Sequence, residues 1–147
     1  MAVAWPLVRA ALVARLSPLV APSGVRVYDG PIVSGDGPSA YLTIAHAPST
    51  PDDTGGTFEQ ENGPDGYSAT ERGGVLMELG AVTGSARVPS VFATFDAIAS
   101  HLQSDMTLGG TLTAGSTVTA SATVVEAQTQ SGAVQRLVIT VQYLTRI

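Results

Sequence analysis

The residues of this chain that could carry chemistry are few, and most of them are acids. Its 147 residues include twelve acids, seven arginines and two histidines, with neither lysine nor cysteine. Neither His46 nor His101 has a second histidine four residues away, as a zinc-binding helix would need. The chain also has no G-x-S-x-G turn that would present a nucleophilic serine. The sequence therefore predicts no catalytic residue, and we expect a protein that is not an enzyme.

One segment has the glycine spacing of a phosphate-binding loop. It runs from Gly110 to Thr117, with the second glycine at Gly115. Ser116 stands where such a loop requires the lysine that neutralises the phosphates, and no helical pattern follows it. A Gly- and Thr-rich entry into a strand explains the segment better than nucleotide binding does.

The acids gather in one stretch, from 47 to 73, which holds six of them against a single arginine. The rest of the chain has six acids and six arginines and is neutral overall. The stretch shows neither a helical nor a strand pattern, and connections this long are usually functional or disordered. We expect a flexible acidic arm whose candidate assembly or lumen residues are Asp52, Asp53, Phe58, Glu59, Glu61, Asp65, Tyr67 and Glu71.

The acidic arm does not have the residue spacing of a calcium-binding loop, so no metal and no cofactor are predicted. Its two aromatic residues, Phe58 and Tyr67, suit a segment that becomes ordered against a partner surface. A mobile surface loop with two incidental aromatic rings is the alternative. With a pI near 4.7 and no basic cluster, specific binding to nucleic acid is not expected.

The first element that must position these residues is a helix near the start of the chain. An apolar stripe at helical spacing comprises Trp5, Val8, Leu12, Leu16 and Leu19, and Pro18 predicts that the helix ends near Leu16. The opposite side is also apolar, with Ala2, Ala10, Val13 and Ala14. Such a helix is normally covered on both sides, and its second cover is either the rest of the fold or another subunit.

The remaining patterns predict five strands and a second helix. Strands are expected at 24–29, 40–46, 74–82, 116–126 and 133–145, and a half-exposed helix from Pro89 to Ser104. The fold class is therefore α+β: one domain, residues 1–147, with an antiparallel or mixed β-sheet covered by two helices. A long acidic insertion and a C-terminal β-hairpin complete it. No apolar stretch reaches the length of about 18 residues needed to cross a bilayer, and the start lacks the pattern of a signal peptide.

This layout resembles the tail terminator (tail completion) proteins of long, non-contractile-tailed bacteriophages. The resemblance rests on an opening helix that ends in ALVARLSPLV, on GVRVYDG, AYLTIAH and GVLMEL, and on the ARVPSVFATFDAIASHL and LVITVQYL segments. It implies a small α+β subunit of a hexameric ring on the head-proximal end of the tail tube. Such a ring stops tube polymerisation and provides the surface that joins the head.

The resemblance also implies partners and a location. The partners would be further copies of the chain, the tail tube protein and a head-completion or connector protein, with DNA only as passing cargo and no membrane. The protein would be made in the bacterial cytoplasm and reside in the virion tail. Candidate subunit-interface residues are Trp5, Val8, Leu12, Val13, Leu16, Tyr143, Leu144 and Ile147. The alternatives are a connector ring of the phage neck and a small β-rich binding module with an acidic ligand- or cation-binding loop.

Overall fold

The computed structural model describes residues 3–32, 40–50, 54–82, 91–129 and 132–147. Within them lie two helices, α1 (Trp5–Val20) and α2 (Val91–Ser104), and a short 3₁₀ turn at Ala21–Ser23. The strands are β1 (Arg26–Asp29), β2 (Ala40–Ile44), β3 (Gly56–Asn62), β4 (Ala69–Val82), β5 (Thr117–Thr129) and β6 (Gly132–Arg146). The predicted Pro89 start of the second helix lies outside the described residues.

The strands form one mixed sheet in the order β1-β2-β4-β6-β5. β1 and β2 are parallel, and the other neighbours are antiparallel. β2 and β3 both pair with the same edge of the long strand β4. β3 pairs with its first half and β2 with its second half, so β2 and β3 lie one after the other along β4. The α+β fold class with two helices is thereby confirmed.

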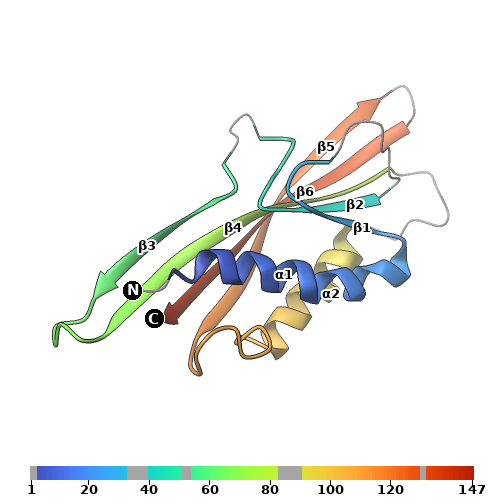
Figure 1. Ribbon diagram of the computed structural model, residues 1–147. Helices are drawn as coiled ribbons and strands as arrows, with labels where there is room; N and C mark the ends of the chain where they lie inside the picture. Colours follow the sequence, from blue (N-terminus) through green and yellow to red (C-terminus); the bar gives the residue numbers. More distant parts are fainter. Residues whose placement is uncertain (1–2, 33–39, 51–53, 83–90, 130–131) are drawn as a thin grey trace.

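Both helices pack on one face of the sheet and contact each other, and Figure 1 shows α2 at a steep angle to α1. In β4, which contains the strand expected at 74–82, alternate side chains face the helices, so Val75, Met77 and Leu79 are buried. Leu137, Ile139 and Val141 of β6 join the same core, together with Val8, Leu12 and Leu16 of α1 and Ile98 and Leu102 of α2. The helices cover only the middle of the sheet, so the β3–β4 hairpin extends beyond them at the end where both chain termini lie (Figure 1).

The predicted end of the first helix is wrong. α1 continues through Pro18 to Val20, and the backbone N–H of Ala21 still donates to the carbonyl of Ser17. Proline costs one backbone hydrogen bond, to the carbonyl four residues earlier. That residue, Ala14, is exposed, so water can satisfy its carbonyl, and the apolar stripe that ends with buried Val20 keeps the last turn in place.

The prediction that residues 47–73 lack secondary structure is also wrong. Gly56–Asn62 form β3, and β4 begins at Ala69 rather than near Gly74. The two strands pair in unbroken antiparallel register from Gly56 opposite Val75 to Asn62 opposite Ala69. Strand β3 was not predicted because its residues are mostly polar. All of them after Gly56 are exposed, so the sequence shows no alternation of apolar and polar residues there.

Candidate assembly surfaces

The turn that ends the β3–β4 hairpin is held in a defined conformation by one carboxylate. Oδ1 of Asp65 accepts hydrogen bonds from the backbone N–H groups of Tyr67 and Ser68, at 3.0 and 2.9 Å, and from the Ser68 hydroxyl. These bonds lower the pKa of Asp65 below its usual value. The backbone N–H of Gly63 also donates to the carbonyl of Ser68 across the turn. Asp65 is therefore a structural residue of the hairpin tip.

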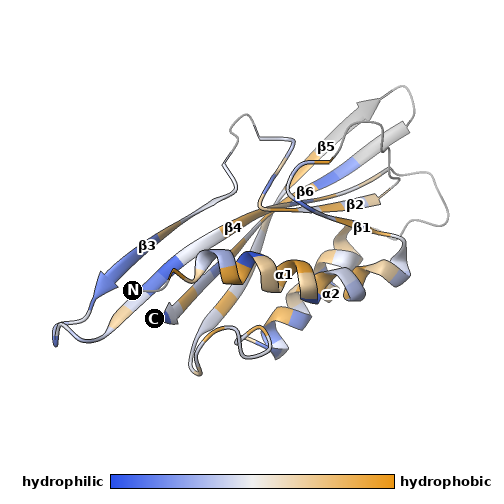
Figure 2. Ribbon diagram, viewed as in Figure 1, coloured by the Kyte–Doolittle hydropathy of each residue, from blue (hydrophilic) through white to orange (hydrophobic). Residues whose placement is uncertain are grey.

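The two aromatic residues of the arm are on the surface, as a docking role requires. Tyr67 sits on the tip with 97% of its surface exposed, and Phe58 on β3 is 49% exposed. Glu59 and Glu61 on β3 are exposed as well, and Figure 2 shows the hydrophilic character of this strand. Asp52 and Asp53 lie outside the described residues.

Glu71 differs from Glu59, Glu61 and Asp65, the other arm acids that the structure describes, because it is completely buried. Its carboxylate accepts hydrogen bonds from the backbone N–H of Ala4 at 3.0 Å, the amide of Gln60 at 2.9 Å and the hydroxyl of Tyr143 at 2.6 Å. Because it binds backbone N–H at the start of α1, it caps this helix from the sheet. The placement of Glu71 on an exposed arm or lumen surface is therefore wrong.

Burial has the largest effect on the pKa of Glu71, and it acts to raise it. The hydrogen bonds from Gln60, Tyr143 and the backbone N–H groups of Ala4 and Trp5 together outweigh burial, so the pKa lies below its ordinary value of 4.5. Burial, together with the hydrogen bond to the charged Glu71 carboxylate, raises the pKa of the Tyr143 phenol. The pair therefore consists of a charged carboxylate and a neutral phenol at neutral pH.

A second buried glutamate on β4 repeats this arrangement on the opposite face of the sheet. Glu78 accepts from the hydroxyl of Tyr41 at 2.6 Å and from the backbone N–H of Ser49 at 2.9 Å. In both cases a tyrosine on a flanking strand lies over a glycine of β4 two residues after the glutamate: Tyr143 over Gly73, and Tyr41 over Gly80. This repeated arrangement was not predicted, although Glu71-Arg72-Gly73 and Glu78-Leu79-Gly80 share the spacing E-x-G.

The candidate interface residues fall into two groups. Val8, Leu12, Leu16 and Tyr143 are buried within the subunit, so their assignment to a subunit interface is wrong. Trp5, Val13 and Ile147 are half-buried against the core, and Leu144 on β6 is 38% exposed. The indole N–H of Trp5 donates to the carbonyl of Gly74 at 2.9 Å.

The outward side of α1 is apolar and carries no charge. Its exposed residues are Pro6, Leu7, Ala10, Ala14 and Pro18, and nothing in the described part of the chain covers them. Figure 2 shows α1 as mostly apolar, with hydrophilic segments between the apolar ones. The two arginines of α1 lie on its flanks, where Arg9 pairs with Asp29 at 2.7 Å and Arg15 with Asp105 at 2.9 Å. We call the exposed residues Leu7, Ala10, Ala14 and Pro18 the outer face of α1.

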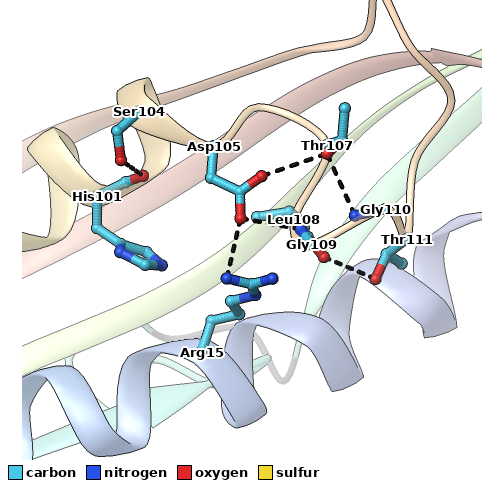
Figure 3. A network of polar contacts seen from close by, with 9 residues as sticks. All are labelled: Arg15, His101, Ser104, Asp105, Thr107, Leu108, Gly109, Gly110 and Thr111. Carbon is cyan, nitrogen blue, oxygen red and sulfur yellow. Dashed lines mark hydrogen bonds and ion pairs between the residues drawn. The ribbon is translucent and has the colours of Figure 1, made fainter.

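Figure 3 shows how the second of these ion pairs is supported. Asp105, which follows α2, also accepts from the backbone N–H of Gly109 at 2.9 Å and from the hydroxyl of Thr107 at 3.2 Å. The Gly109 bond is the main reason that the pKa of Asp105 is lowered. Arg15 lies against Gly109, where a side chain would collide with the guanidinium. The network therefore joins α1 to the loop after α2.

An apolar groove opens beside the start of α1. It has a volume of about 150 Å³ and is lined by Ala4, Leu7, Thr111, Leu112, Thr113, Thr145, Arg146 and Ile147. We call it the terminal groove. A larger hollow of about 380 Å³ on the face of the sheet away from the helices is lined by Thr57, Glu59, Arg72 and Gln142, among others, and includes no histidine, serine or cysteine.

The residues considered for chemistry are separated in the fold. His101 is on α2 and His46 follows β2. Ser116 of the phosphate-loop-like segment is buried, its hydroxyl 2.6 Å from that of Thr145, and strand β5 follows it instead of a helix. Among the described residues, no group of three or more histidine or acidic side chains is arranged to hold a metal ion.

No protein-family model matches the chain, and no curated protein shows significant sequence similarity to it. Neither helix in the described residues has the length and apolar character needed to span a membrane. The surfaces themselves therefore carry the functional argument.

Proposed function

We propose that this protein is a structural ring subunit of a phage virion, placed at the head-proximal end of the tail tube. There the ring stops polymerisation of the tube and offers the surface that joins the head. The proposal combines the resemblance of the sequence layout to tail terminators with one structural observation, the apolar outer face of α1.

This face supports self-association for two reasons. Exposed apolar surface that is continuous along a helix is typical of an interaction site. Both arginines of the helix are held at its flanks by acids of the same chain, so a partner can approach without desolvating a charge. A closed ring uses two different patches of each subunit, and the outer face of α1 is proposed as one of them.

The exposed acids of β3 fit the same proposal. Glu59 and Glu61 carry negative charge on a projecting strand. If they face the channel, they repel DNA phosphates, so the duplex passes without binding.

The test measures the mass of the assembly and its position on tail tubes. The purified protein is expected to form a ring of defined mass, by native mass spectrometry, which caps one end of tail tubes in electron micrographs. Ala14→Glu places a charge on the outer face and should convert the ring to monomers. The matched control is Ser100→Glu on the exposed side of α2, which should leave the ring intact.

Three results would count against the proposal. A monomeric wild-type protein at micromolar concentration would exclude a self-assembling ring. Rings that bind only portal or connector complexes, and never tube ends, would indicate a neck connector instead. A monomer with a calcium-dependent shift in melting temperature would indicate the binding module.

A further inference from the structure

The tip of the β3–β4 hairpin presents an aromatic side chain to solvent from an ordered turn. Tyr67 is 97% exposed, although a tyrosine ring is mostly apolar surface. Its own backbone N–H is one of the groups bound by Asp65, so the position of the residue is fixed before any partner arrives. Rigid, exposed tyrosines bind at a low entropic cost and are frequent among residues that dominate interface energies.

The terminal groove has complementary size and chemistry. The groove has a volume of about 150 Å³, which is enough for one benzene ring, and its lining combines aliphatic residues with threonines and Arg146. Leu7, Leu112 and Ile147 supply the apolar lining. The groove also begins at Leu7, which belongs to the outer face of α1, so an occupant would extend the interface already proposed there.

The charges of the hairpin and the groove are opposite. The end of the hairpin, from Gln60 to Thr70, carries Glu61 and Asp65 and no basic residue, whereas Glu59 lies opposite Arg72 in the β3–β4 ladder. Arg146 is the one charged side chain that lines the groove among the described residues, and it is exposed. Opposite charges at the rim of an apolar contact favour the correct partner and its orientation.

We infer that the hairpin tip of one copy of this chain docks in the terminal groove of another copy, with the Tyr67 ring inserted among Leu7, Leu112 and Ile147. The inference rests on the proposed self-assembly. It names the hairpin tip as the second patch that each subunit uses, and the terminal groove as the surface that receives it. The outer face of α1 and the hairpin tip then belong to different contacts of each subunit, as a closed ring requires.

The absence of cysteine from the natural sequence makes cross-linking a clean test. Two variants, Tyr67→Cys and Thr111→Cys, are co-expressed, one of them carrying a larger tag, and oxidised after purification. A disulfide forms only where Cα atoms approach to about 4.4–6.8 Å, so the expected product is a covalent dimer of one copy of each. The matched control replaces Tyr67→Cys with Val124→Cys, also well exposed but on β5, and should give no such dimer.

A second pair of variants measures how much the aromatic ring of Tyr67 contributes to assembly. Tyr67→Ala should raise the concentration at which half of the protein is assembled about 10- to 30-fold, as expected for an interface residue of this kind. Tyr67→Phe keeps the aromatic ring and should change the concentration of half-assembly less than about threefold. Because the side chain is fully exposed in the subunit, neither change should alter the melting temperature of the monomer.

The results separate this inference from the proposed function. Rings that form normally but give no Tyr67→Cys to Thr111→Cys dimer, and that tolerate Tyr67→Ala, would overturn the docking contact and leave the ring proposal standing. A cross-linked dimer without rings would support the contact and contradict the ring. A monomer with no cross-link would contradict both.

Discussion

The side chains that hold this fold together include two buried glutamates, Glu71 and Glu78, on the same central strand. A buried carboxylate is tolerable only when hydrogen bonds compensate its lost hydration. Each glutamate obtains a tyrosine hydroxyl and a backbone N–H from other parts of the chain. Each tyrosine ring occupies the space over a β4 glycine, so the two E-x-G units are packing sites as well as polar ones.

Removing a tyrosine hydroxyl should therefore destabilise the protein. Tyr143→Phe and Tyr41→Phe each leave a buried carboxylate with one donor fewer, and we expect a loss of about 1.5–3 kcal/mol in the free energy of unfolding. Denaturation by urea at pH 7 measures it. Tyr67→Phe on the exposed hairpin tip is the control and should be neutral; equal effects at all three positions would contradict the role of the buried pairs.

The charge of Glu71 gives the protein a defined acid sensitivity. The pKa of Glu71 is lower in the folded state than in the unfolded chain, so its charge stabilises the fold. This contribution to the free energy of unfolding is fully present above the ordinary pKa of 4.5, and it is lost as the pH falls through the lower, folded pKa. Glu71→Gln should cost stability at pH 7, and the difference from wild type should shrink as the pH falls below 4.5 and through the lower, folded pKa of Glu71. Melting temperatures across this range measure it. A difference that stays constant would show that the carboxylate is not charged in the fold.

The burial of Glu71 could have been predicted from the local sequence pattern. Alternation in Val75, Met77 and Leu79 extends backwards through Gly73 to Glu71, which puts the glutamate on the buried face. The partner groups come from the start of α1 and from β3 and β6. These long-range contacts could not be predicted from local patterns.

At the level of elements, α1 is a helix stabilised by packing in spite of an internal proline. The proline lies in the last turn, where the lost hydrogen bond belongs to an exposed carbonyl. The apolar spacing predicted the buried side of the helix correctly, whereas the proline rule failed because burial of Val20 outweighs it. In the same way β3 was missed because an edge strand that is exposed on both faces has no apolar alternation.

Pro18→Ala should stabilise the protein by about 1 kcal/mol. The substitution restores one helical hydrogen bond and introduces a residue with a higher helix propensity. The unfolded chain gains backbone conformational entropy when the proline is lost, and this offsets part of the benefit. Thermal unfolding of the monomeric Ala14→Glu background measures the effect without interference from assembly. A lower melting temperature would indicate that the proline is required to shape the end of α1.

At the scale of the whole molecule, the fold class and the burial pattern were accessible from the sequence, but the surfaces were not. Which apolar residues of α1 remain exposed depends on where the sheet lies, and the terminal groove is built from segments far apart in the chain. The hexameric ring, its place on the tail tube and its partners remain proposals that rest on resemblance and on these surfaces.

The assembly should tolerate high salt. The outer face of α1 is uncharged, and apolar contacts are not screened by ions, whereas surface charge pairs are. We expect the ring mass to be unchanged between 0.1 and 1 M sodium chloride, by light scattering. Dissociation in 1 M salt would show that charge pairs, rather than apolar packing, hold the subunits together.

The cap that Glu71 places on α1 has a mechanical consequence. Glu71 lies on β4, the strand next to the hairpin tip, and it binds the backbone at the start of α1. It therefore links the two surfaces proposed for assembly and fixes their relative orientation. A rigid link sets the angle between successive subunits, and that angle sets how many copies close a circle. Weakening it by Glu71→Gln should broaden the copy-number distribution of the rings in native mass spectra, beyond any loss of stability.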